Sequence, residues 1–203
     1  MEPDTEIRAS KGRWNLETGE LGVRGPVRAL RSKDLTVTAS ALQGNTQQGF
    51  LDLIQPVRLE QKDGAINAGT TRWNLAEQRL RSIAPFRGKR QDATATGDGF
   101  VIDETATTVI ISKACQLTQP GESLKAHRCS WNWVTNRVVA DGDVVLRRQD
   151  PDQETRAPRM EGQLGSEEGV RFGSTGQRVQ SSIRFRPDQS RSTPQSSRPR
   201  VSF

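Results

Sequence analysis

The sequence predicts an all-β protein: an antiparallel meander of about ten to twelve strands, built from about three repeats of ~58 residues. Three observations indicate this. A Trp-Asn motif recurs at a fixed interval, apolar and polar residues alternate along most segments, and no stretch sustains a 3.6-residue apolar period. Only 32% of the 203 residues are hydrophobic and 5% are aromatic, which favours a thin, elongated architecture over a thick two-layer core.

The repeat is defined by the pairs Trp14-Asn15, Trp73-Asn74 and Trp131-Asn132, whose tryptophans are 59 and 58 residues apart. Each pair follows an alanine by four intervening residues and precedes an aliphatic residue, a Gly or Ala, and a Val or Phe at constant offsets. The aliphatic and final positions are Leu21 and Val27, Leu80 and Phe86, and Val138 and Val144. Agreement at this many positions indicates an internal repeat.

Within each unit we expect antiparallel hairpins with one apolar face. Alternation with polar residues puts four side chains on one face in the second unit: Leu51, Leu53, Val57 and Leu59. Four-residue connections after each Trp-Asn pair predict that Trp14 faces Val23, Trp73 faces Ser82 and Trp131 faces Ala140. We also expect turns at Gly44-Asn45-Thr46, Lys62-Asp63-Gly64 and Gly97-Asp98-Gly99.

The formal net charge of +6 is unevenly distributed. Six arginines and one acid fall between Arg178 and Phe203, so the first 177 residues carry only about +1. We therefore expect a β domain at 1–186 and a disordered, basic Ser/Pro/Arg tail at 187–203, with no nucleic-acid partner. No segment has the length of a membrane span, and residues 1–6 lack the features of a signal peptide.

Side chains that carry chemistry are scarce. His127 is the single histidine, and no phosphate loop or nucleophile elbow is present, so we expect no enzyme activity, no catalytic residue, no metal site and no cofactor. Cys115 and Cys129 lie symmetrically about a predicted turn at 119–123, which is compatible with either a cross-strand disulfide or two buried thiols. Asp141-Gly142-Asp143 is interpreted as a strand bulge rather than part of a calcium loop.

The Trp-Asn motif, the Gly-x-Val steps Gly25-Pro26-Val27 and Gly142-Asp143-Val144, and the following Leu35-Thr36-Val37-Thr38-Ala39-Ser40-Ala41-Leu42 strand resemble one family. These features, over about residues 7–185, are similar to the OstA-like lipopolysaccharide-transport proteins, the periplasmic LptA/LptC bridge group, and most like cyanobacterial LptC-type proteins. The resemblance implies a β-jellyroll folded like a taco, with acyl chains held in its apolar interior.

The resemblance also implies a function, partners and a location. We expect a periplasmic lipid-binding bridge component of lipopolysaccharide export, located between an inner-membrane ABC transporter and the outer membrane. Its partners would be lipopolysaccharide or a related glycolipid, that transporter, and other Lpt-type proteins joined by edge-strand pairing. Inner-membrane association would need a segment absent from this chain.

The predicted lipid-groove residues are the inward-facing apolar side chains of the repeats: Trp14, Leu21, Val27, Leu53, Val57, Trp73, Leu80, Phe86, Trp131, Val138 and Val144. The alternative is a structural or adhesive β-repeat protein with a closed core, in which these residues only hold the sheet together. A continuous apolar groove open at one end would distinguish the first possibility from the second.

Overall fold

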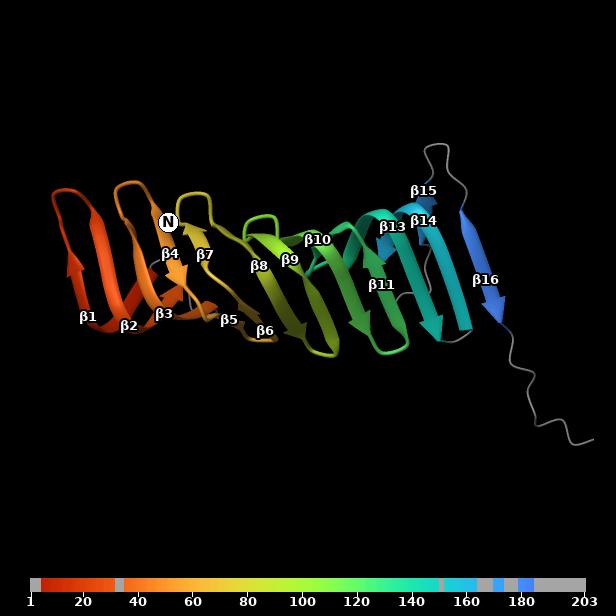
Figure 1. Ribbon diagram of the computed structural model, residues 1–203, viewed down its shortest axis with the longest axis horizontal. Coiled ribbons are helices and arrows are strands. Elements are labelled where there is room, and N and C mark those ends of the chain that lie inside the picture. Colours follow the sequence, from red (N-terminus) through yellow and green to blue (C-terminus); the bar gives the residue numbers. More distant parts are fainter. Residues whose placement is uncertain (1–4, 32–34, 150–151, 164–169, 174–178, 185–203) are drawn as a thin grey trace, which may run out of the picture.

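The computed structural model describes residues 5–31, 35–149, 152–163, 170–173 and 179–184. Regular structure in these ranges is entirely β-strand and forms one antiparallel sheet, in which the strands follow one another along the molecule (Figure 1). The prediction of an all-β antiparallel fold is confirmed. The predicted tail at 187–203 and the end of the predicted domain, at 186, lie outside the described residues. The strands are β1 (Thr5–Trp14), β2 (Glu20–Arg31), β3 (Leu35–Asn45), β4 (Phe50–Ile54), β5 (Val57–Gln61), β6 (Gly64–Ala68), β7 (Thr71–Asn74), β8 (Arg79–Arg90), β9 (Ala93–Asp103), β10 (Thr108–Gln119), β11 (Glu122–Ala126), β12 (Arg128–Asn132), β13 (Arg137–Gln149), β14 (Asp152–Gln163), β15 (Arg171–Gly173) and β16 (Gln180–Arg184).

Several short strands are halves of one long strand, because both halves pair with the same neighbour. β4 and β5 both pair with β3, β6 and β7 both pair with β8, and β11 and β12 both pair with β10 and β13. β15 and β16 likewise both pair with β14. Neighbouring long strands are therefore consecutive in the chain, as a meander requires.

Breaks in some long strands and shifts of pairing register in others lie near the middle of the sheet and divide it into two arms. The pairing register shifts between Arg24 and Val27, between Ser82 and Pro85, and at equivalent points of β1, β10 and β13. A shift in register bends a strand and increases its twist. We call the half that lies uppermost in Figure 1 the upper arm and the other half the lower arm.

Two sequence predictions concern these bends. The bulge predicted at Asp141-Gly142-Asp143 is confirmed, since the register of β13 shifts between Asp141 and Val144. The turn predicted at 97–99 is wrong, because these residues lie inside β9. Gly99 has a positive φ of 77°, and the neighbouring strands β8 and β10 shift register beside it. The glycines there permit a bend in a continuous strand rather than a reversal of the chain.

The core lies between the two arms. One cluster of buried apolar residues contains side chains of the upper arm, such as Leu51 and Phe100, and of the lower arm, such as Val37 and Leu124. The faces that point away from this cluster are mostly polar, so many strands alternate between buried and exposed residues; in β8, for example, Leu80 and Ser82 are buried while Arg79 and Arg81 are exposed. This alternation is the period-2 signature of a sheet with one buried face.

Turns of one kind connect the strands of the upper arm. They begin at residues 15, 45, 74, 103 and 132, which are Asn, Asn, Asn, Asp and Asn. In every turn the Oδ1 atom of this first residue accepts a hydrogen bond from the backbone N–H of the residue three positions on, which is Thr18, Gln48, Glu77, Ala106 or Thr135. In the first and last turns it also accepts one from the residue two positions on, Glu17 or Val134. This is the local hydrogen bond that favours Asn and Asp in turns.

The turns correct the predicted register. Trp14 pairs with Leu21, Trp73 with Leu80 and Trp131 with Val138, so the predicted pairings are wrong by two residues in all three units. The physical reason is that the Asn of the Trp-Asn pair starts the turn instead of extending the strand. The fifth residue of each turn, at 19, 49, 78, 107 and 136, then has a positive φ.

Adjacent turns are also joined to each other. The N–H groups of Thr46, Leu75, Glu104 and Trp133 donate to the carbonyls of Gly19, Gly49, Gln78 and Thr107 in the preceding turns. The turns are thus spaced by 29 or 30 residues, half of the repeat seen in the sequence.

The turn at Asp103 has a carboxyl group where the others have an amide. A side-chain hydrogen bond from Thr105 and the backbone N–H of Ala106 lower the pKa of Asp103 to about 2, with a further contribution from Arg79.

Candidate functional site

A continuous row of inward-facing side chains crosses the upper arm next to these turns. Cross-strand pairing links its members in order: Trp14, Leu21, Gly44, Leu51, Trp73, Leu80, Ile102, Val109, Trp131 and Val138. One tryptophan therefore occurs at every fourth long strand, which at about 4.8 Å per strand places successive tryptophans roughly 19 Å apart. The three-fold sequence repeat is the signature of this row.

The eleven predicted groove residues all lie on the inner face, but they differ in burial. Eight are buried in the core: Val27, Leu53, Val57, Trp73, Leu80, Phe86, Val138 and Val144. Leu21 and Trp131 are half-buried and pack against that core. Whether any of them contacts an acyl chain remains a prediction.

Trp14 differs from the others, since 57% of it is exposed. The reason is an offset between the arms. Arg31 at the lower end of β2 contacts Leu75 just beyond β7, three long strands further along. Among the described residues, no strand lies three places before β1 to cover Trp14. The inner face is therefore open at this end of the sheet.

The two arms meet along a seam, and its first contact is a buried cluster around Arg31. We call Arg31, Trp73, Leu75 and Glu104 the first seam. The Arg31 Nη2 atom donates to the Leu75 carbonyl at 3.4 Å, and the guanidinium lies over the Trp73 ring at 5.3 Å from its centroid. Trp73 Nε1 donates to Glu104 Oε1 at 3.3 Å, and Arg31 Nε lies 3.6 Å from Glu104 Oε2.

The first seam is buried, but its charged groups are only partly compensated. Arg31 is only 2% exposed, and its Nη1 atom has no hydrogen-bond partner among the described residues. Burial raises the pKa of Glu104 above its usual value, while Arg31 and Trp73 act in the opposite direction. A buried ion pair of this kind fixes geometry more than it contributes stability.

The same contact recurs one repeat later, at Arg90, but there the seam is open. We call Arg90, Trp131 and Trp133 the second seam. An Arg90 Nη1–H donates to the Trp133 carbonyl, as Arg31 does to Leu75. No carboxylate of the described residues hydrogen-bonds to the Trp131 indole, which is half-buried where Trp73 is fully buried.

A pocket of about 340 Å³ lies at the second seam, between the lower ends of β8, β9 and β10 and the upper ends of β12 and β13. Its volume is at the lower end of the range for small-molecule sites. The lining residues are Arg90, Gln91, Asp92, Ala93, Thr94, Leu117, Thr118, Gln119, Pro120, Trp131, Trp133, Val134 and Asn136. Leu117, Trp131 and Trp133 belong to the core or pack against it, so the floor of the pocket is the apolar interior itself.

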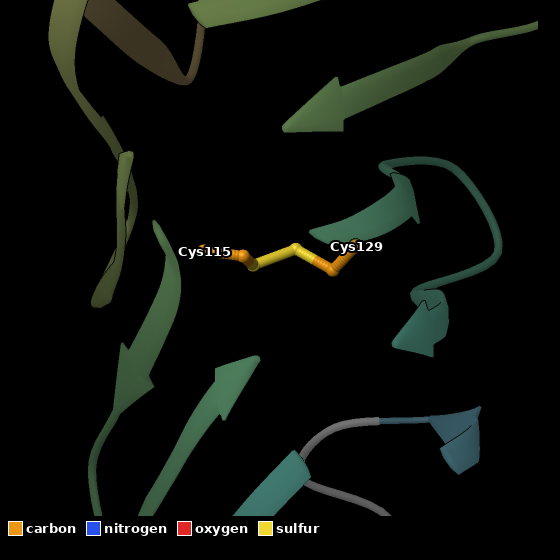
Figure 2. Close-up of a disulfide and its surroundings, with 2 residues drawn as sticks. All are labelled: Cys115 and Cys129. Carbon is orange, nitrogen blue, oxygen red and sulfur yellow. A yellow bond between two sulfur atoms is a disulfide. The ribbon is translucent and has the colours of Figure 1, made fainter. Parts of the chain in front are cut away.

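A disulfide between Cys115 and Cys129 joins the walls of this pocket at their base. It links the lower half of β10 to β12 and spans the space between these strands (Figure 2). The expected direct opposition is wrong: Cys115 pairs with Ala126 and Cys129 with Ile111, because the strands bend between the two cysteines. The Cα atoms are 6.0 Å apart. Leu117 and Trp131 lie two residues beyond the cysteines on the same inner face.

The second repeat has Val57 and Thr71 at the positions equivalent to the cysteines of the third repeat, 58 residues earlier. Both are buried, so the bend of the second repeat is held by packing and that of the third by a covalent bond.

Sequence reasoning missed the arginines of both seams. Arg31 and Arg90 are 59 residues apart, which is the repeat interval, and each ends a strand on its inner face. A charged residue recurring in register with the tryptophans was the available signal. In the sequence, an arginine at a strand end looks like an ordinary exposed residue. Only the position of the second arm shows that its side chain is enclosed.

Within the described residues, no group of three His, Cys, Asp or Glu side chains could hold a metal ion. His127 pairs with Asp143 instead, with 3.1 Å between Nε2 and Oδ2. The described part of the chain also contains no helix with the length and apolar character that crossing a membrane demands.

The fold and the site define an all-β protein whose bent sheet encloses an apolar strip. No protein-family model and no curated protein matches the chain. Among solved structures, it is similar to LptH, described as the LptA-homologous periplasmic component of the conserved lipopolysaccharide transport device from Pseudomonas aeruginosa. The match has 11% sequence identity and a TM-score of 0.32, and covers 92% of this chain and 97% of LptH.

Proposed function

We propose that this protein is a lipid-binding bridge component of lipopolysaccharide export, located in the periplasm, whose inner face receives acyl chains. The observation that carries the proposal is the row from Trp14 to Val138, an inner strip that crosses ten successive pairing positions and is uncovered at its first end. The OstA-like sequence motif of residues 7–185 points to the same role.

The energetics of the strip suit a reversible carrier. Each methylene transferred from water into an apolar interior gains about 0.8 kcal/mol, so a twelve-carbon chain gains roughly 9 kcal/mol. To admit a chain, the arms have to part at the seam, where Arg31 and Arg90 hydrogen-bond across it, and the apolar packing between the arms has to be replaced by packing against the chain. Breaking a few hydrogen bonds costs much less than the chain contributes.

The partners follow from the sheet's ends. β1 lies at one end of the described pairing order and so presents an unpaired edge, which is a template for another strand. We propose that related bridge proteins pair with this edge and that the line of sheets extends between an inner-membrane ABC transporter and the outer membrane. The uncovered Trp14 and Leu21 would then continue the apolar strip into the neighbouring protein.

A closed-core structural protein is the second candidate. Eight of the eleven predicted groove residues are buried in one cluster, and this observation favours a sheet that packs against itself. The two candidates differ in whether the arms open.

A photo-crosslinking amino acid at Leu80 tests the proposal in cells with active lipopolysaccharide export. The neighbouring Arg81 points away from the core on the same strand and serves as the matched control. A carrier predicts lipid adducts from position 80 and not from position 81. Adducts from neither position, with the protein folded and present, would contradict the lipid-binding role.

A further inference from the structure

We propose that the pocket of the second seam is the entry portal for an anionic amphiphile, with Arg90 holding the anionic group and Trp131 and Leu117 receiving the first part of the chain. This inference rests on the proposed function and assigns it a location. It follows from comparing the two seams, which are built from equivalent residues but differ in closure.

The first seam shows what a closed site looks like. There the guanidinium of Arg31 is sandwiched against Trp73, and Glu104 accepts the indole N–H, so neither the cation nor the ring is available to a ligand. At the second seam Arg90 is half-buried and Trp131 retains exposed surface next to the pocket.

The lining has the two chemistries that an amphiphile requires. Leu117, Trp131 and Trp133 continue into the core and offer an apolar path. Arg90 offers a planar cation that can hold phosphate or carboxylate oxygens with paired hydrogen bonds, and amide and hydroxyl groups surround it. Indole rings are favoured where one end of a ligand is apolar and the other is polar.

The disulfide gives the portal a fixed base. Because Cys115 and Cys129 tie β10 to β12 two residues from Leu117 and Trp131, the bond limits the separation of these two walls at that end. The pocket therefore has one end that is fixed by the disulfide and another end that can widen. The first seam has Val57 and Thr71 in this place and no covalent tie.

Binding of dodecyl phosphate to the purified full chain, below its micelle concentration, tests the portal by calorimetric titration. Arg90→Gln should weaken binding by about tenfold or more, because one charge-assisted contact is lost. Arg87→Gln, on the outer face of the same strand, is the matched control and should have no effect. Asp92 lines the pocket as a carboxylate, so Asp92→Asn should tighten binding of the same probe.

Two further probes separate the two halves of the proposal. Dodecyl maltoside has the same chain without the charge, and its affinity should be unchanged in Arg90→Gln. Inorganic phosphate has the charge without the chain, and it should bind far more weakly than dodecyl phosphate. The portal is overturned if the wild-type chain does not bind dodecyl phosphate, if Arg87→Gln weakens it as much as Arg90→Gln, or if inorganic phosphate binds equally well.

Ala93→Phe keeps Arg90 and its bond to Trp133 but fills the pocket, so it covers the case in which Arg90→Gln does not fold. It should abolish binding of both dodecyl probes. If long acyl chains still reach Trp73 at the wild-type rate in Ala93→Phe, the portal is wrong while the proposed function stands. If they never reach Trp73 in the wild-type chain, the proposed function itself fails.

Discussion

Replacing the disulfide by the equivalent residues of the second repeat, in the double variant Cys115→Val/Cys129→Thr, should destabilise the protein by about 3 kcal/mol. The disulfide closes a loop with a sequence separation of 14, and a cross-link of this length raises the free energy of the unfolded chain by roughly that much, because it removes conformational entropy. Val57 and Thr71 show that these side chains fit buried at the equivalent bend, so little packing energy should be lost in addition.

Equilibrium urea denaturation measures this effect. For a chain of this length an increment of about 3 kcal/mol corresponds to a midpoint shift of roughly 1 M. Wild-type protein in dithiothreitol should show the same shift, while the double variant should be insensitive to the reductant. If the double variant is as stable as the oxidised wild-type protein, the disulfide does not constrain the arms, and the second seam has no fixed base.

Three other predictions concern the turns, the core and the edge. Asp103→Asn should keep the turn, because Asn occupies the equivalent position in the other four turns, and should cost up to about 1 kcal/mol at neutral pH through loss of the ion pair with Arg79. Since the folded pKa of Asp103 is lowered to about 2, its ionised form stabilises the wild type above the unfolded pKa, and that stability is lost as the pH falls from about 3.8 toward 2; acid titration of the variant should lack this loss. Trp73→Ala should cost about 3–5 kcal/mol in urea denaturation and Trp14→Ala less than about 1 kcal/mol, because one ring is fully buried and the other is 57% exposed; equal losses would contradict the offset of the arms. Ile7→Pro should weaken association with the proposed partner bridge protein in analytical ultracentrifugation, because proline disturbs strand pairing in β1, and unchanged association would show that this edge is not the contact.

The sequence was sufficient to predict features that depend on neighbouring residues. Alternation placed Leu53, Val57 and Leu80 on the buried face, and the Trp-Asn interval located the repeat. The register was missed by two residues because the side chain of an Asn such as Asn15 starts a turn that the strand pattern does not show.

Features that depend on the second arm were out of reach. Trp14 and Trp73 have the same motif, and only the three-strand offset between the arms makes one exposed and the other buried. Arg31 and Arg90 likewise acquire their roles only when the arms face each other. The repeat was visible in the sequence, but the difference between its closed and open seams arises from long-range contacts.

The central claim is that the apolar interior opens to acyl chains, and quenching of Trp73 by a brominated chain tests it most directly. A variant with Trp14, Trp131 and Trp133 replaced by Phe retains Trp73, which is fully buried against the core, as the single fluorophore. A carrier predicts that a chain brominated near its middle quenches Trp73 while aqueous iodide does not. Protection of Trp73 from both quenchers, with the chain present at saturating concentration, would show a closed core and contradict the lipid-carrier account.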